Sequence, residues 1–172
     1  MSNIPVIPDL GAAQLDVYPN NVADVMFNAL RTGIPEIQLA LRRPLRTEDP
    51  SWTLSVFPVS WAPDTLEMGG TDPSFEPTDS TYSFQIQTLV KTTDEQDGRV
   101  WGAYLAKSVR LVLYRGPSFV VPLRQLKETR ADGSVERYQR SGIKQQRFAA
   151  NSLNNLFLQY SSTDYWVQTE SF

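Results

Sequence analysis

Apolar residues recur along the chain with two different spacings, and each spacing predicts one kind of secondary structure. Over 20–33 and again over 94–115 they recur every three or four residues, which predicts two amphipathic helices. Caps and stop signals bound both helices: Asn20 or Asn21, Gly33 and Pro35 for the first, and Thr93 or Asp94, Gly116 and Pro117 for the second. The residues expected on the buried sides are Val22, Val25, Met26, Ala29 and Leu30 in the first helix, and Trp101, Leu105, Ser108 or Val109, and Val112 in the second.

Single alternation of apolar and polar residues predicts strands, most clearly from Tyr82 to Val90. The alternation changes phase at Phe57, beside Pro58, which predicts a β-bulge or an edge position. The pair Asp132-Gly133 between two short runs predicts a β-hairpin. The other predicted strand segments are 37–41, 52–61, 119–121, 123–130, 135–140 and 156–160, together with an apolar C-terminal stretch, 165–172, that we expect to pair in a sheet.

The order of these elements predicts an α+β fold, with a mostly antiparallel β-sheet and two helices packed on one face. Residues 1–172 are enough for a single domain with its own core. Residues 1–18 carry two prolines, and we expect them to form an extended N-terminal arm. Residues 62–81 are rich in proline, glycine, aspartate and threonine, and we expect them to form a long flexible loop.

The residue types that are missing restrict the chemistry. The chain has no histidine and no cysteine, so it lacks the usual acid–base group near neutral pH, the readiest nucleophile and the main ligands of transition metals. No serine-nucleophile or phosphate-binding motif is present. Helix capping accounts for Asp94, Glu95 and Asp97, whose spacing matches no calcium loop. We therefore expect no enzymatic activity, no metal and no cofactor.

Localisation signals are also missing from the sequence. No apolar run approaches the roughly 20 residues of a membrane span. The N-terminus has no basic region followed by an apolar run, so a secretory signal is not expected. The net charge of −3 is too small to indicate a nucleic-acid or membrane partner by itself.

Charged residues are unevenly distributed, because 64–97 is mainly acidic and 124–147 mainly basic. Unlike patches on one small domain suit head-to-tail association of copies, and ordinary solvated strand faces are the alternative. Nucleic-acid binding has less support, since Tyr138 is the only aromatic residue of the basic hairpin. The candidate partner-binding residues are Asp64, Leu66, Met68, Phe75 and Glu76 in the predicted loop, and Arg124, Lys127, Arg130, Arg137 and Arg140 in the basic hairpin.

The central part of the chain resembles the tail terminator proteins of long-tailed bacteriophages. The strand TYSFQIQTLVKTTDEQDGR leads through a polar turn into the helix VWGAYLAKSVRLVLYRG, which carries the aliphatic–arginine–aliphatic run Val109-Arg110-Leu111. The first helix, NNVADVMFNALRTG, and the closing strand, DYWVQTESF, also fit the layout of that family. The N-terminal arm and the 62–81 loop are longer than its simplest members need, so a related neck protein stays open.

The resemblance implies an α+β subunit of a virion, made in the host cytoplasm, that forms a ring of copies of itself, a hexamer in that family. The ring would cap the head-proximal end of the tail tube, stop its polymerisation and join the tail to the head. Its partners would be the tail tube protein and the head–tail connector or stopper protein, with DNA passing through the lumen without specific binding. The alternatives are a head–tail connector or head-completion protein, a monomeric peptide- or ligand-binding module, and an enzyme that uses only carboxylates and hydroxyls.

Overall fold

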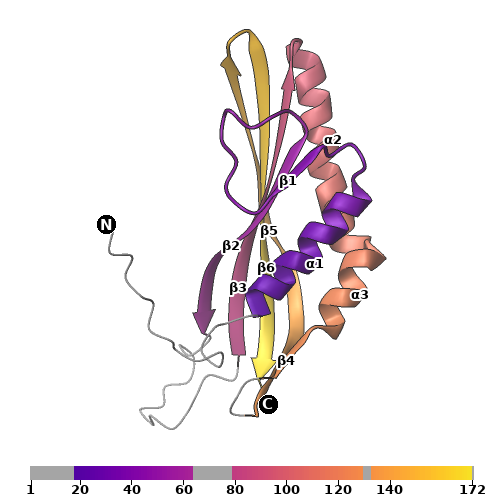
Figure 1. Ribbon diagram of the computed structural model, residues 1–172, viewed down its shortest axis with the longest axis vertical. Helices are drawn as coiled ribbons and strands as arrows, with labels where there is room; N and C mark the ends of the chain where they lie inside the picture. Colours follow the sequence, from indigo (N-terminus) through magenta and orange to yellow (C-terminus); the bar gives the residue numbers. More distant parts are fainter. Residues whose placement is uncertain (1–17, 64–78, 130–132, 172) are drawn as a thin grey trace, which may run out of the picture.

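The computed structural model describes residues 18–63, 79–129 and 133–171 (Figure 1). In them, three helices lie on one face of a curled six-stranded sheet: α1 (Tyr18–Gly33), α2 (Glu95–Arg115) and α3 (Pro117–Gln125). The strands are β1 (Leu39–Leu41), β2 (Thr53–Pro63), β3 (Asp79–Thr92), β4 (Lys127–Thr129), β5 (Val135–Leu153) and β6 (Leu156–Ser171). Their order in the sheet is β1-β2-β3-β6-β5-β4, and all neighbours are antiparallel except β1 and β2.

The prediction of mixed helix and strand content is confirmed, but the prediction of two helices is wrong. Residues 119–121, predicted as a strand, belong to α3. Gly116 and Pro117 do end α2, yet Pro117 also starts the next helix, where its fixed φ is suitable and its missing N–H costs nothing. Phe119 and Leu123 are one helical turn apart, and both are buried.

The sheet has one apolar face and one largely polar face. Tyr82, Phe84 and Ile86 of β3 are at most 1% exposed and point toward the helices. On β6, Tyr165 pairs with Phe84 and Val167 pairs with Tyr82, so both lie on the same side. One core cluster joins this face to all three helices. The other side, here named the open face, carries residues such as Gln85, Gln87, Arg140, Arg147, Asp164, Trp166 and Gln168.

Helix α1 begins at Tyr18, two residues before the predicted cap, so Asn20 and Asn21 lie in its first turn. The Tyr18 ring stacks on that of Tyr82 with the centroids 5.8 Å apart, which fixes the start of the helix against β3. The predicted inner side of α1 is confirmed for Val22, Met26, Ala29 and Leu30, which are buried, whereas Val25 is only partly buried.

Helix α2 begins where the acidic pattern predicted, but its buried side is rotated from the expected one. Asp94 caps it by accepting a hydrogen bond from the Asp97 N–H at 2.9 Å. Leu105, Val109 and Val112 are buried as predicted, whereas Trp101 is 41% exposed. The helix approaches β6 so closely that a Cβ on Gly102 would lie 3.0 Å from the Gln159 Cβ. Glycine therefore occupies the position facing the sheet, and Trp101 lies beside the contact.

Described strands and the first helix take up the ends of the segments predicted as a loop and an arm. Strand β2 continues to Pro63 and β3 begins at Asp79, with Ala62 paired to Thr81. Residues 64–78 and 1–17 lie outside the described residues. The predicted irregularity beside Pro58 is confirmed, because the β2–β3 register shifts between Pro58 and Ser60. Trp52, predicted to open this strand, lies just before it with φ 61°.

Two hairpins form the far side of the sheet. The predicted Asp-Gly hairpin joins β4 to β5, and Gly133 has a φ of 86°. A second hairpin, not predicted, joins β5 to β6 through Asn154 and Asn155, whose φ values of 52° and 64° suit a two-residue type I′ turn. The expected pairing of the C-terminal stretch is confirmed through Ser171, because β6 lies between β3 and β5.

Alanine substitutions of one buried and one partly exposed residue of α2 test which side of this helix packs in the core. We expect Leu105→Ala to lower the free energy of unfolding by about 2–5 kcal/mol, because Leu105 is fully buried. Trp101→Ala removes edge-to-face contacts with Trp52 and Tyr104 and should cost only about 0.5–1.5 kcal/mol. Urea unfolding of both variants measures the difference, and equal losses would contradict the observed helix orientation.

Candidate functional site

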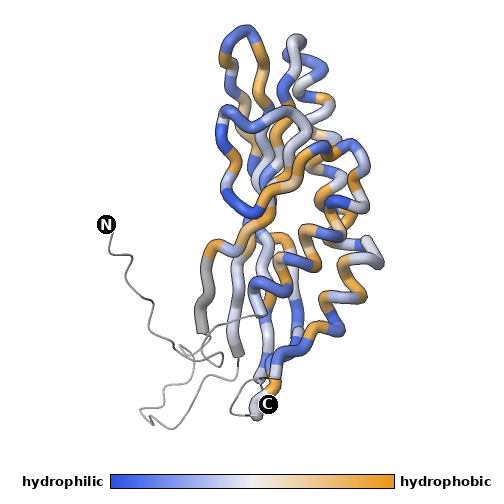
Figure 2. Tube along the Cα trace, viewed as in Figure 1, coloured by the Kyte–Doolittle hydropathy of each residue, from blue (hydrophilic) through white to orange (hydrophobic). Residues whose placement is uncertain are grey.

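Helix α2 carries apolar residues on the side that faces away from the sheet. Val100, Tyr104, Leu111 and Tyr114 are 59%, 40%, 49% and 66% exposed. Their spacings of four, seven and three residues place them on one side of a helix with 3.6 residues per turn, opposite the buried Val109. We name these four residues the outer row. Figure 2 shows hydrophobic residues recurring along α2.

Few polar groups lie along the outer row. Lys107 lies on the same side of the helix and is exposed. The Tyr104 hydroxyl donates a hydrogen bond to Glu36 Oε1 at 2.7 Å, and this bond raises the pKa of Tyr104. Exposed apolar side chains gathered in one place are typical of a surface that contacts a partner.

The structure divides the predicted basic residues between two faces. Arg124 lies in the last turn of α3, on the helix side of the sheet. Arg137 pairs with Glu170 and Arg140 with Gln168, which places both arginines on the open face. Lys127 of β4 lies directly opposite Arg137 in the ladder. The predicted basic patch therefore becomes a group of three on the open face and a separate arginine on α3.

Part of the open-face charge is neutralised by cross-strand partners. Arg137 Nε donates to Glu170 Oε1 at 3.0 Å. Arg140 Nε donates to Gln168 Oε1 at 2.5 Å, and its guanidinium carbon lies 5.9 Å from the centre of the Trp166 ring. Such exposed pairs contribute at most about 1 kcal/mol each. They orient the side chains more than they stabilise the fold.

The other predicted partner-binding residues are Asp64, Leu66, Met68, Phe75, Glu76 and Arg130, and they lie outside the described residues. Their role stays a prediction. Within the described residues, the acidic side chains Asp94, Glu95 and Asp97 lie at the start of α2, where Glu95 pairs with Arg99 at 2.5 Å. These carboxylates complement the helix dipole.

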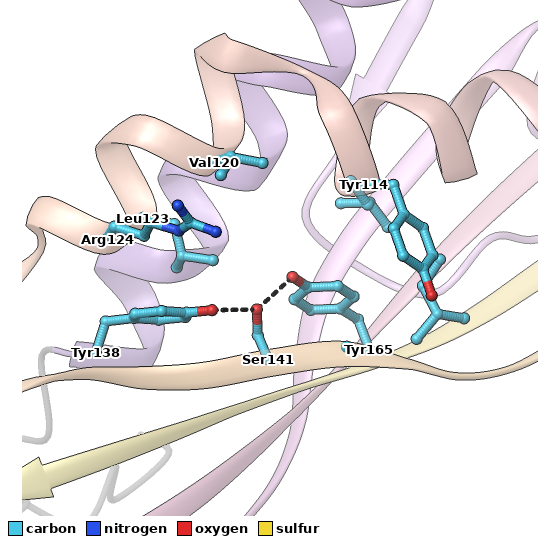
Figure 3. Close-up of a pocket in the computed structure, with 10 residues that line it drawn as sticks. Tyr114, Val120, Leu123, Arg124, Tyr138, Ser141 and Tyr165 are labelled. Carbon is cyan, nitrogen blue, oxygen red and sulfur yellow. Dashed lines mark hydrogen bonds between the residues drawn. The ribbon is translucent and has the colours of Figure 1, made fainter.

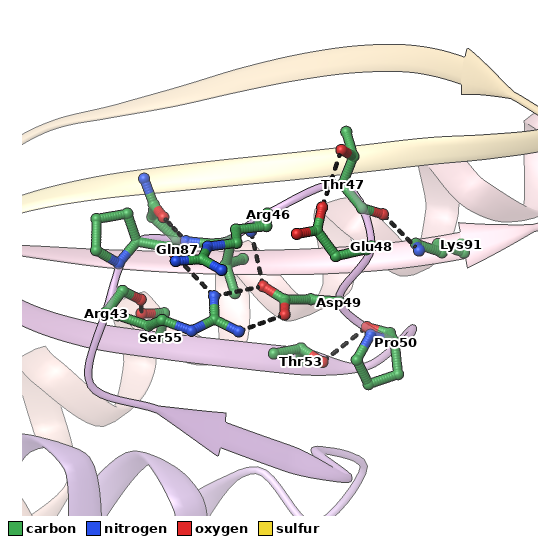
Figure 4. Close-up of polar contacts among 12 residues, drawn as sticks. Arg43, Arg46, Thr47, Glu48, Asp49, Pro50, Thr53, Ser55, Gln87 and Lys91 are labelled. Atoms are coloured by element: carbon green, nitrogen blue, oxygen red, sulfur yellow. Dashed lines mark hydrogen bonds and ion pairs between the residues drawn. The ribbon is translucent and has the colours of Figure 1, made fainter.

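The connection between β1 and β2 covers part of the open face (Figure 4). The Arg43 guanidinium makes two hydrogen bonds to the Asp49 carboxylate, at 2.6 and 2.9 Å, and the Arg46 N–H donates to it at 2.7 Å. These contacts lower the pKa of Asp49 to about 2. The Leu45 N–H donates to Gln87 Oε1 at 2.8 Å, which fixes the segment to β3.

The Asp49 contacts predict a dependence of stability on acid. A carboxyl group whose pKa is lowered by folding stabilises the protein above its unfolded pKa, and this stabilisation is lost as pH falls toward 2. Asp49→Asn should cost about 1–3 kcal/mol near neutral pH, because Arg43 and the Arg46 N–H lose their charged acceptor.

Thermal melts of the parent and Asp49→Asn at pH values from 7 to about 2 measure this effect. The difference between the two proteins should shrink as the pH falls below 4. Asp24→Asn is the matched control, because Asp24 is exposed, and its ion pair with Arg42 is exposed as well. A constant gap between parent and Asp49→Asn across this range would contradict the assignment.

A cavity of about 180 Å³ lies between α3, the end of α2 and the sheet (Figure 3). On its floor, Ser141 Oγ lies 3.0 Å from the Tyr138 hydroxyl and 2.7 Å from the Tyr165 hydroxyl. Burial raises the pKa of Tyr165 to about 12, so this hydroxyl keeps its proton. Val120, Leu123 and Arg124 of α3 lie above the floor. Of these residues, only Arg124 was predicted from the sequence to bind a partner.

Glu136 is a second feature that the sequence analysis missed. Its carboxyl group is fully buried on the helix side of the sheet, although Glu136 lies among the basic residues of 124–147. The Tyr82 hydroxyl donates to it at 2.5 Å and the Thr169 hydroxyl at 2.6 Å. Both hydroxyls donate to the same oxygen, Glu136 Oε1, and they tie β5 to β3 and β6.

The remaining findings concern metals, membranes and relatives. In residues 18–63, 79–129 and 133–171, no three acidic side chains gather as a metal ion would need. None of the helices in the described part of the chain combines the length and apolar character of a bilayer-crossing segment. No protein-family model matches the sequence, and no curated protein matches it.

Proposed function

We propose that the protein is a structural subunit that assembles with copies of itself and with dissimilar neighbours. The observation that carries this proposal is that α2 is apolar on both sides, with one side in the core and the outer row in solvent. A helix that serves only its own domain keeps polar residues on its outer side. Burial of the outer row in an interface would remove this exposed apolar surface from water.

The free edge of β5 supports the same proposal. Strand β4 pairs only with residues 135–137, so within the described residues most of β5 has no neighbour on its outer side. Phe148 and Leu153 on this strand are 61% and 45% exposed. An unpaired strand edge provides backbone donors and acceptors to a partner.

The free energies of burial and of association indicate that the outer row and the β5 edge act together. Burying the exposed part of four such side chains contributes about 4–6 kcal/mol, whereas association costs about 4–15 kcal/mol in lost freedom. The outer row alone would therefore give weak binding. A second contact at the β5 edge or the open face is needed for a stable assembly.

The more specific form of the proposal follows the family resemblance. The subunits would form a ring, a hexamer as in tail terminators, at the head-proximal end of a phage tail tube. The ring would stop tube polymerisation and would contact the tube protein and the head–tail connector. No catalytic step is required of it, and DNA would pass through its lumen. A head-completion protein of the neck is the closest alternative. The cavity beside α3 favours the other candidate, a monomeric ligand-binding module.

Replacing outer-row residues tests the proposal directly. Leu111→Gln combined with Tyr114→Gln should leave the fold intact and weaken self-association at least about tenfold, because about 1.4 kcal/mol of lost burial is a factor of ten. Sedimentation velocity at several concentrations measures the association. Arg31→Gln with Arg46→Gln is the control, because these exposed arginines lie outside α2, and it should associate like the parent.

The proposed role in phage assembly is tested on phage particles made without this protein. Deleting the gene from the phage that encodes it should give overlong tails or tails that never join heads, as seen by electron microscopy. Normal particles without this polypeptide would reject the proposed role. A single copy in solution together with normal particles would favour the ligand-binding module.

A further inference from the structure

The cavity between α3 and β5 has the size of one small ring or branched side chain. Its volume is about 180 Å³, and an apolar cavity of about 150 Å³ can hold benzene. Leu113, Val120, Leu123 and Ile143 supply apolar walls. Tyr114, which is 66% exposed, and Arg124, which is also exposed, lie at its rim and leave it accessible from solvent. The walls therefore favour a compact apolar group.

The floor of the cavity has one hydrogen-bond donor to spare. Tyr138, Ser141 and Tyr165 bring three hydroxyl hydrogens, and the two bonds through Ser141 use two of them. Whichever oxygen donates in each bond, one O–H hydrogen has no acceptor among these three residues. The burial that raises the pKa of Tyr165 to about 12 keeps this hydroxyl protonated as a donor at neutral pH. A ligand that offers an acceptor would satisfy the remaining hydrogen.

Arg124 gives the cavity a positive charge that no carboxylate among the described residues neutralises. Among the described residues, no carboxylate forms an ion pair with Arg124, and the ten residues lining the cavity include no acidic side chain. The guanidinium side chain extends from α3 over the tyrosine floor (Figure 3). Its charge acts on Tyr165 and lowers that pKa against the larger effect of burial. A guanidinium beside one remaining O–H donor suits an anionic pair of oxygens.

We propose that this cavity binds a carboxylate attached to a compact apolar group. Arg124 and the hydroxyls of Tyr138, Ser141 and Tyr165 would hold the carboxylate, and the apolar walls would hold the apolar group. The proposal does not rest on the assembly function. The carboxylate can belong to a free organic acid or to an acidic side chain of a neighbouring polypeptide. The chemistry of recognition is the same in both cases.

Benzoate is the probe, and titration of the full-length protein by calorimetry or by amide NMR shifts at neutral pH measures its binding. A ligand of this size should bind with a dissociation constant on the order of 1 mM. Benzamide keeps the ring and loses the charge, so it should bind at least about tenfold more weakly. Absence of saturable benzoate binding at ten times that concentration, or equal binding of benzamide, would overturn the proposal.

Variants assign the binding to this cavity. Arg124→Gln should weaken benzoate binding about 10- to 100-fold, because a hydrogen bond to a charged group is lost. Ser141→Ala should weaken it by a smaller factor. Arg99→Gln, at the other end of α2, is the control and should bind like the parent. Circular dichroism establishes that each variant is folded. Folded Arg124→Gln that binds benzoate with parental affinity would place the site elsewhere and overturn the assignment.

A final measurement distinguishes the two sources of the carboxylate. Sedimentation velocity compares the protein with and without saturating benzoate. Release of subunits from an assembly would assign the cavity to an acidic side chain of a neighbouring copy. An unchanged sedimentation profile with benzoate bound would assign it to a free acid.

Discussion

Strand β6 hydrogen-bonds to β3 on one side and to β5 on the other along almost its whole length. Its alternate residues divide the molecule, because Tyr165 and Val167 enter the core while Asp164 and Trp166 lie on the open face. A shift of one residue in this register would reverse both sets. The helices can pack only on the apolar side of the sheet, so this register determines where the outer row, the cavity and the open face lie.

The helix layer carries both proposed contact features. Gly98 and Gly102 let α2 lie close against Gln159 of β6, so a narrow side of the helix is enough to fill the core. The outer row then remains in solvent. The chain turns at Gly116 directly into α3, whose Phe119 packs edge-on against Tyr165 with the ring centres 5.6 Å apart. That contact leaves the rest of α3 above the tyrosine floor, which creates the cavity.

The open face is organised by polar contacts that cross between strands. Arg137 with Glu170 and Arg147 with Asp164 join β5 to β6 at 3.0 and 3.2 Å. The Arg43–Asp49 pair holds the β1–β2 connection over β3, with Asp49 almost fully buried. Of the seven basic residues in 124–147, Arg137 and Arg147 are therefore neutralised by carboxylates of β6. Arg124, on the helix side, has no such carboxylate partner among the described residues, so its guanidinium is more available to a new partner than those of Arg137 and Arg147.

Local patterns in the sequence determined the clearest elements: the Tyr82–Val90 alternation, the Asp94 cap, the inner side of α1 and the Asp-Gly hairpin. Each depends on residues near one another in the chain, so spacing alone predicts it. Tertiary structure decided which side of α2 is buried, that residues 119–121 are helical, and that Glu136 is inside. A short apolar run suits a helix as well as a strand, and the burial of a charge depends on partners such as Tyr82, far away in the sequence. The cavity likewise exists only where α3 and β5, separated in the chain, are brought together by the sheet register.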